Sequence, residues 1–146
     1  MVIGRKEGPR LRACLDSVRR VGGPIVYVDS GSTDASCQIA QESNVDVVAL
    51  DADLPFSASR ARHAGFMQLL SQCPACEFVF FIDGDCEVVS GWPEKGRELL
   101  RVFPQAAAVA GRRRERDPHR NWFNLECEWE WDRPAGEVAA IGGDGI

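Results

Sequence analysis

Short apolar runs alternate with segments of helical periodicity through the first two thirds of the chain, and this alternation constrains the fold most. Residues 1–3, 25–28, 45–50 and 78–82 have the composition of strands. Helical spacing follows each run, at residues 10–20, up to about 42, at 57–72 and at 91–103. Alternating strands and helices predict an α/β domain with a Rossmann-like, mostly parallel sheet flanked by helices on both faces.

The later part of the chain has a weaker pattern. We expect a strand near residues 106–110, a charged loop over 112–120, an aromatic helix over 121–131 and a further strand over 137–141. The run 78–82 is continuously apolar, which is typical of a central strand covered on both faces.

Composition limits the class of protein. The chain has 146 residues, which suits one domain, and 45% of them are hydrophobic, enough for a core. The formal net charge of −5 argues against a nucleic-acid partner, which requires a basic face. Even an apolar run such as 78–82 is too short for a transmembrane segment, and no signal peptide is visible. We therefore expect a cytoplasmic protein, with peripheral association at the inner face of the membrane left open.

The six cysteines lie among ordinary hydrophobic segments, which indicates free thiols in a reducing compartment. Cys73 and Cys76 form a single CxxC pair. Zinc would require a second pair or suitably spaced histidines, so we do not favour a metal or redox role for this pair.

Polar residues follow the predicted strands, at the edge where ligands bind in open parallel sheets. Asp83-Gly84-Asp85 comes directly after the run 78–82. Two carboxylates this close repel each other unless a cation lies between them, and Mg²⁺ and Mn²⁺ prefer oxygen ligands. The motif therefore indicates a divalent-cation site, with a solvated acidic turn as the alternative.

Two weaker signals lie at the same predicted edge. The turn from Asp29 to Asp34 leads from a strand into a helix and could offer backbone N–H groups to a nucleotide, or could simply cap the helix. Arg60 and Arg62 lie in the first turns of the helix at 57–72, where they could contact a diphosphate or lie on a solvated face.

In this order, these segments resemble glycosyltransferase family 2, the inverting enzymes with the GT-A fold. The opening Val2-Ile-Gly-Arg-Lys-Glu-Gly8 is similar to the family's first strand and turn, and Tyr27 to Asp34 is similar to its Val-Asp-Asp-Gly-Ser-Thr-Asp stretch. Residues 57–65 resemble the Ala-Arg-Asn-x-Gly segment, 81–85 the metal-binding DxD strand, and 142–144 the segment with the catalytic aspartate.

The resemblance implies roles for particular positions. Glu7 and Asp29 would contact the nucleoside, with Asp29 near the base and Ser30 beside it. Arg62 would lie near the base or the diphosphate. Ser30 stands where the family more often has a second Asp, and His63 stands where it has Asn.

The remaining implied roles concern chemistry. Asp83 would touch the ribose or uracil side and help to bind Mn²⁺ or Mg²⁺, Asp85 would ligate that cation, and Asp144 would be the general base. A base of this kind typically supplies roughly 10²–10⁴-fold in rate.

The implied reaction moves a sugar from a nucleotide-diphosphate sugar, most simply a UDP-sugar, to a carbohydrate or lipid-linked acceptor, with inversion. Relatives often build cell-surface or extracellular polysaccharide. We expect residues 1–146 to form one GT-A domain, the nucleotide-sugar-binding part, with acceptor-side elements missing. The alternatives are a non-catalytic nucleotide-sugar-binding fragment and a sugar nucleotidyltransferase, which would need a glycine-rich phosphate loop after the first strand.

Two later features have a structural and a functional interpretation. The aromatic residues of 122–131 could stack on a sugar or meet a lipid-linked acceptor, but packing against the sheet is favoured. Arg112-Arg113-Arg114 could approach an anionic lipid or phosphate, but a solvated loop is favoured.

Overall fold

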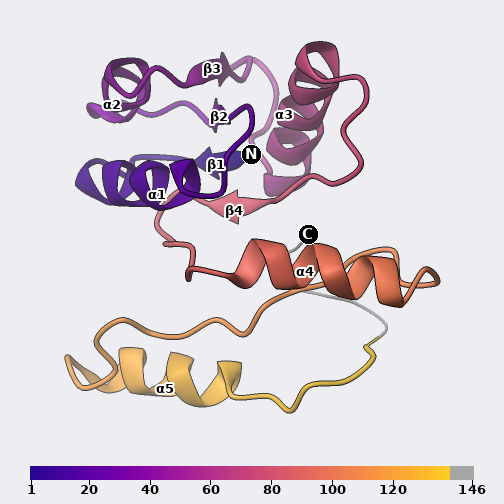
Figure 1. The fold of residues 1–146 in the computed structure, drawn as a ribbon. Coiled ribbons are helices and arrows are strands. Elements are labelled where there is room, and N and C mark those ends of the chain that lie inside the picture. The colour runs from indigo at the N-terminus through magenta and orange to yellow at the C-terminus, as the bar shows by residue number, and fades with distance from the viewer. Residues whose placement is uncertain (139–146) are drawn as a thin grey trace.

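The computed structural model describes residues 1–138, and these contain one parallel sheet (Figure 1). Its strands are β1 (Val2–Gly4), β2 (Val26–Asp29), β3 (Asp46–Ala49) and β4 (Ile82–Asp83). Their order is β3-β2-β1-β4, and each neighbouring pair is parallel. The chain therefore builds outward from β1 to β3 and then returns to the other side of β1. This reversal is a topological switch point, where open α/β sheets bind ligands beyond the strand ends.

The first four helices alternate with the strands as the periodicity predicts, and a fifth follows the fourth directly in the described chain. They are α1 (Pro9–Arg19), α2 (Ser36–Glu42), α3 (Ala58–Gln72), α4 (Trp92–Val102) and α5 (Trp122–Trp131). Ser57 caps α3, because its hydroxyl accepts a hydrogen bond from the Arg60 amide (3.2 Å).

Helices cover both faces of the sheet, so the predicted α/β architecture is confirmed. Alternate residues of each strand point to opposite faces. Val2, Tyr27 and Ile82 face one core cluster, which the apolar sides of α1 and α2 complete. Ile3 and Val28 face the other, which α3 covers.

α3 approaches the second face closely because it carries glycine at the contact. A Cβ added at Gly65 would lie 2.1 Å from Met1 Sδ and 2.7 Å from Val28 Cγ2. Real atoms cannot approach this closely. The short distance between α3 and β2 therefore requires a residue without a side chain at position 65.

The prediction of a central strand over 78–82 is wrong in two respects. Only Ile82 and Asp83 pair as a strand, and within the described residues β4 lies at the end of the strand order. Residues 78–81 run beside the sheet with partial burial, and the Met1 amino group donates to the Phe80 carbonyl (2.7 Å). Because β1 is three residues long, it provides few partners for a longer β4.

The expected strand near 106–110 is also absent from the described chain, where these residues have no regular structure. Residues 106–108 are exposed, which fits their short alanine side chains and small contribution to a core. The strand predicted at 137–141 is not formed at 137–138, and 139–141 lie outside the described residues.

The aromatic helix forms, but its expected packing against the sheet does not. Figure 1 shows α4 between α5 and the sheet, and none of the residues of α5 is buried. Trp122 and Trp129 contact each other edge to face, with ring centroids 5.6 Å apart, and both remain exposed. Within residues 1–138, every helix is too short or too polar to cross a lipid bilayer.

Candidate functional site

An open pocket of about 370 Å³ lies at the switch point, beyond the carboxyl ends of β1, β2 and β4. This volume falls within the usual range for small-molecule sites. Its lining comes from the ends of these strands and from the start of α3: Ile3, Gly4, Glu7, Ser30, Phe56, Ser57, Ala58, Asp83 and Asp85.

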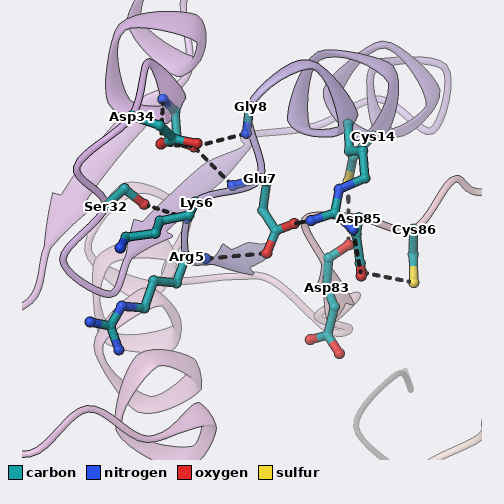
Figure 2. A network of polar contacts seen from close by, with 12 residues as sticks. Arg5, Lys6, Glu7, Gly8, Cys14, Ser32, Asp34, Asp83, Asp85 and Cys86 are labelled. Atoms are coloured by element: carbon teal, nitrogen blue, oxygen red, sulfur yellow. Dashed lines mark hydrogen bonds and ion pairs between the residues drawn. The ribbon is translucent and has the colours of Figure 1, made fainter.

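The loop after β1 is held in an unusual conformation by hydroxyl groups from the neighbouring turn. Lys6 has a positive φ of 59°, and Gly8 has φ 52° and ψ −130°, a combination that favours glycine. The Lys6 amide donates to Ser32 Oγ (2.8 Å), and the Glu7 and Gly8 amides donate to Ser36 Oγ (3.0 and 3.1 Å). These bonds fix the direction in which Glu7 enters the pocket (Figure 2).

Ser36 is itself fixed by Asp34. It donates to Asp34 Oδ1 from its hydroxyl (2.6 Å) and from its amide (3.1 Å). Its hydroxyl bond is the main reason why the pKa of Asp34 lies below the ordinary value. The turn after β2 therefore acts as a support for the loop after β1.

Three carboxylates gather around the pocket, and arginines partly neutralise them. Arg10 Nη2 lies 2.9 Å from Glu7 Oε2, and its Nη1 lies 3.8 Å from Asp85 Oδ2. Arg62 Nη2 donates to Asp83 Oδ1 (3.0 Å). The three carboxylates and two guanidinium groups therefore carry a formal charge of about −1 together.

Glu7 lies deepest of the three acids, with 13% of its side chain exposed. Its Oε1 accepts a bond from the Arg5 amide (3.3 Å). Its Oε2 is buried without an aligned hydrogen bond, although Arg10 is near enough for an ion pair. Arg10 therefore stabilises this oxygen by charge and not by an aligned hydrogen bond. A buried oxygen without a hydrogen bond costs free energy. A ligand or water that donates to Glu7 Oε2 from the pocket would remove this cost.

Hydrogen bonds with α1 and β1 hold the backbone of the DxD segment, Asp83-Gly84-Asp85. Cys14 Sγ of α1 donates to the Asp83 carbonyl (3.6 Å), and the Gly84 amide donates to the Ile3 carbonyl (2.7 Å). Burial raises the pKa of Cys14 to about 12, so its thiol stays a neutral donor.

The donor set at the pocket suits a hard divalent cation that is shared with a ligand. Asp83 is 39% and Asp85 46% exposed, so both can reach a cation at the mouth of the pocket. Among residues 1–138, no cluster of three or more Asp, Glu, His or Cys side chains forms a complete cage. Mg²⁺ characteristically binds one or two protein carboxylates and takes its other oxygens from water and phosphate. The residues present therefore fit such a cation only together with a phosphate-bearing ligand.

The structure brings together most of the residues that the sequence singles out. Glu7, Ser30, Asp83 and Asp85 line one pocket, and Arg62 reaches it through Asp83. Asp144 lies outside the described residues.

Asp29 is placed differently from its neighbours. Its residue is 3% exposed, Oδ1 accepts from the Tyr27 hydroxyl (3.0 Å), and Oδ2 accepts from the Ser32 amide (2.7 Å). In this state its carboxylate supports the turn beneath the pocket, and Ser30 rather than Asp29 forms the lining.

Phe56 is a pocket residue that the sequence analysis did not single out. The ring lines the pocket just before α3. The available signal was a large apolar residue directly before the capping Ser57, a position that often packs against the first turns of a helix.

The side chains of Arg112, Arg113 and Arg114 contact residues of α5. Arg112 and Arg114 pair with Glu128 of α5 (3.3 and 3.4 Å), and Arg113 lies over the Trp131 ring. The Glu115 amide, followed by these arginines, holds the pKa of Glu128 below its ordinary value. The run thus attaches residues 112–115 to α5.

An acidic pocket at the switch point of a parallel sheet, with helices on both faces, defines a Rossmann-like ligand-binding domain. The model of glycosyl transferase family 2 matches residues 2–140, which is nearly the whole chain. The protein therefore belongs to glycosyl transferase family 2, and its domain has the GT-A fold. Members transfer sugars, which implies binding of a nucleotide-sugar donor and an acceptor. A search among curated proteins found no match.

Proposed function

We propose that this domain binds a UDP-sugar together with Mn²⁺ or Mg²⁺ and transfers the sugar, with inversion, to an acceptor hydroxyl of a carbohydrate or lipid-linked glycan. The observation that carries the proposal is the pocket at the ends of β1 and β4, where Glu7, Asp83 and Asp85 gather. We assign the product to cell-surface or extracellular polysaccharide on the family resemblance alone.

The charges around the pocket support a diphosphate donor with a cation. A free diphosphate would be repelled by three carboxylates, whereas a divalent cation bound by Asp85 and Asp83 reverses the local charge. When bound, the cation supplies Lewis-acid stabilisation of the leaving diphosphate.

The side chains near the cation have complementary tasks. Arg62 is already fixed beside Asp83, and its remaining N–H donors are available for phosphate oxygens. Glu7 and Ser30 contact the nucleoside, and Asp29 holds the turn that carries Ser30. Asp144, outside the described residues, takes the proton of the attacking hydroxyl.

Calorimetry with UDP, with and without Mn²⁺, tests donor binding. We expect binding that needs Mn²⁺ and is lost on chelation. Asp83→Asn combined with Asp85→Asn should abolish the Mn²⁺ dependence in a folded sample. Asp16→Asn, an exposed acid on α1, is the matched control and should bind as the unaltered protein does.

A transfer assay then separates an enzyme from a binding fragment. Each of several UDP-sugars is incubated with Mn²⁺ and glycan or lipid-linked acceptors, and release of UDP is followed. Release that depends on the acceptor supports sugar transfer. Binding of UDP without release for any acceptor would support the non-catalytic fragment instead. No binding of UDP in the presence of Mn²⁺ would overturn the proposed donor.

A further inference from the structure

The segment between β3 and α3 is fastened by one arginine. Arg60 donates from Nη1 to the carbonyl oxygens of Leu54 (2.9 Å) and Pro55 (3.3 Å), and from Nη2 to that of Asp51 (2.9 Å). These three acceptors belong to a segment without regular structure, whose residues 51–55 are exposed. Because α3 carries the guanidinium, the bonds tie this exposed segment to a rigid helix.

The fastened segment ends at Phe56, whose ring is confined on two sides. A Cβ added at Gly31 would lie 2.6 Å from Phe56 Cζ, so the ring rests directly on the turn after β2. Gly31 has a φ of +77°, which also favours glycine. The Arg5 guanidinium lies over the ring, 5.1 Å from its centroid.

This arrangement makes Phe56 the aromatic residue of the pocket lining, whose other side chains are small, aliphatic or acidic. An aromatic ring offers a flat apolar contact that the acids cannot provide. The nucleoside is the part of a UDP-sugar that uses such a contact, whereas the diphosphate binds to charge.

We infer that Phe56 sets the affinity of the pocket for the nucleoside part of the donor, and that Arg60 is a positioning residue that holds Phe56 there. The inference rests on the proposed function for its ligand. Arg60 then acts without touching the diphosphate, unlike Arg62 two residues later.

Limited proteolysis tests, without any ligand, whether Arg60 holds the segment 51–56 in place. Chymotrypsin cleaves after phenylalanine, and cleavage at Phe56–Ser57 requires the segment to leave its place. Loss of the charged hydrogen bonds in Arg60→Gln should speed this cleavage by roughly 10-fold, as identified from fragment masses. Arg12→Gln, which breaks an exposed pair with Glu42, is the control and should leave the rate unchanged. An equal cleavage rate in Arg60→Gln and the unaltered protein would show that Arg60 does not hold the segment 51–56.

A double-mutant cycle tests whether Arg60 acts through Phe56. UDP affinity is measured at saturating Mn²⁺ for Phe56→Leu, Arg60→Gln and the double variant, each checked for native circular dichroism. Phe56→Leu should weaken UDP by roughly 3- to 10-fold. Arg60→Gln should weaken it by a similar factor alone, and by less than about twofold in the Phe56→Leu background.

Pyrophosphate with Mn²⁺ is the second probe, because it lacks the nucleoside. Its affinity should be the same in all four proteins. Additive losses for UDP, or an equal loss for pyrophosphate, would overturn the assigned roles. If the unaltered protein binds pyrophosphate but not UDP, the proposed donor and the role of Phe56 are both wrong. The proteolysis experiment still decides whether Arg60 holds the segment 51–56. Arg60→Lys keeps one charged donor group, so its cleavage rate and its UDP affinity should lie between those of Arg60→Gln and the unaltered protein. If Arg60→Gln does not fold, Arg60→Lys takes its place in both tests.

Discussion

Arg62 and Asp83 join the two elements that enclose the switch point: the guanidinium of α3 donates from Nη2 to Oδ1 at the end of β4, at 3.0 Å. The pair lies 21 residues apart in sequence and is only part-buried. It places a cation beside the first acid of Asp83-Gly84-Asp85, so Arg62 has both a structural partner and donors left for a ligand.

Arg62→Ala should weaken UDP binding by ~10-fold or more at saturating Mn²⁺, because charge-assisted hydrogen bonds to phosphate are lost. Affinity for Mn²⁺ alone should not fall, since removal of Arg62 leaves more negative charge near the cation. Arg62→Lys should lie between, because an ammonium lacks the planar fork. Calorimetry with each ligand checks both, with Arg12→Ala as control. UDP affinity within twofold of the unaltered protein would remove Arg62 from the site.

The sequence predicts the architecture well because its signal is repeated along the chain. Four apolar runs and the helical spacing between them are visible one at a time, and the order of the sheet follows the rules for parallel connections. The acids that follow β1 and β4 are predicted to meet for the same reason, and Glu7, Asp83 and Asp85 do so.

Other details cannot be read from the sequence. The hydrogen bonds of Asp29 with the Tyr27 hydroxyl and the Ser32 amide depend on the conformation of the turn, which the sequence pattern does not define. Phe56 lines the pocket at the end of a segment in which three carbonyl groups accept hydrogen bonds from Arg60, and such contacts are not visible in the sequence. An apolar run such as 78–82 shows that residues prefer burial, but not how long a partner strand is available.

Tyr27 should remain un-ionised in the native protein beyond the pH at which an ordinary tyrosine ionises, about 10. Burial, followed by the nearby negative charge of Asp29, raises its pKa. A raised folded pKa means that the stabilisation is fully present below the unfolded pKa and is lost as the pH rises above about 10. Because Tyr27 is the sole tyrosine, its ultraviolet absorbance reports this group alone.

The test is a titration to alkaline pH with absorbance and circular dichroism followed together. Tyrosinate should appear only as the protein unfolds, and Tyr27→Phe should remove this alkaline sensitivity. The same variant should lose about 1–3 kcal/mol at neutral pH, because it leaves Asp29 Oδ1 buried without its donor. Ionisation near pH 10 with native circular dichroism would contradict the buried hydrogen bond.

Gly65→Ala should destabilise the fold by about 1–3 kcal/mol, since the added methyl group overlaps Met1 and Val28 and must push α3 from the sheet. The midpoint of urea unfolding measures the change. Gly136→Ala is the matched control, because a Cβ there meets no atom within 4 Å. Equal midpoints for Gly65→Ala and the unaltered protein would show that α3 does not depend on this close approach.

Asp144→Asn should separate chemistry from binding. If Asp144 is the general base, its loss lowers kcat by roughly 10²–10⁴-fold, because the acceptor hydroxyl then has to lose its proton without help. Donor affinity should stay unchanged, since the UDP site that we propose consists of Glu7, Arg62 and the acids at the end of β4. The measurement is kcat with the acceptor identified by UDP release, beside calorimetry of UDP with Mn²⁺. Asp117→Asn, an exposed acid in the described region, should match the unaltered protein in both. Turnover within a few-fold in Asp144→Asn would assign the proton transfer to another group.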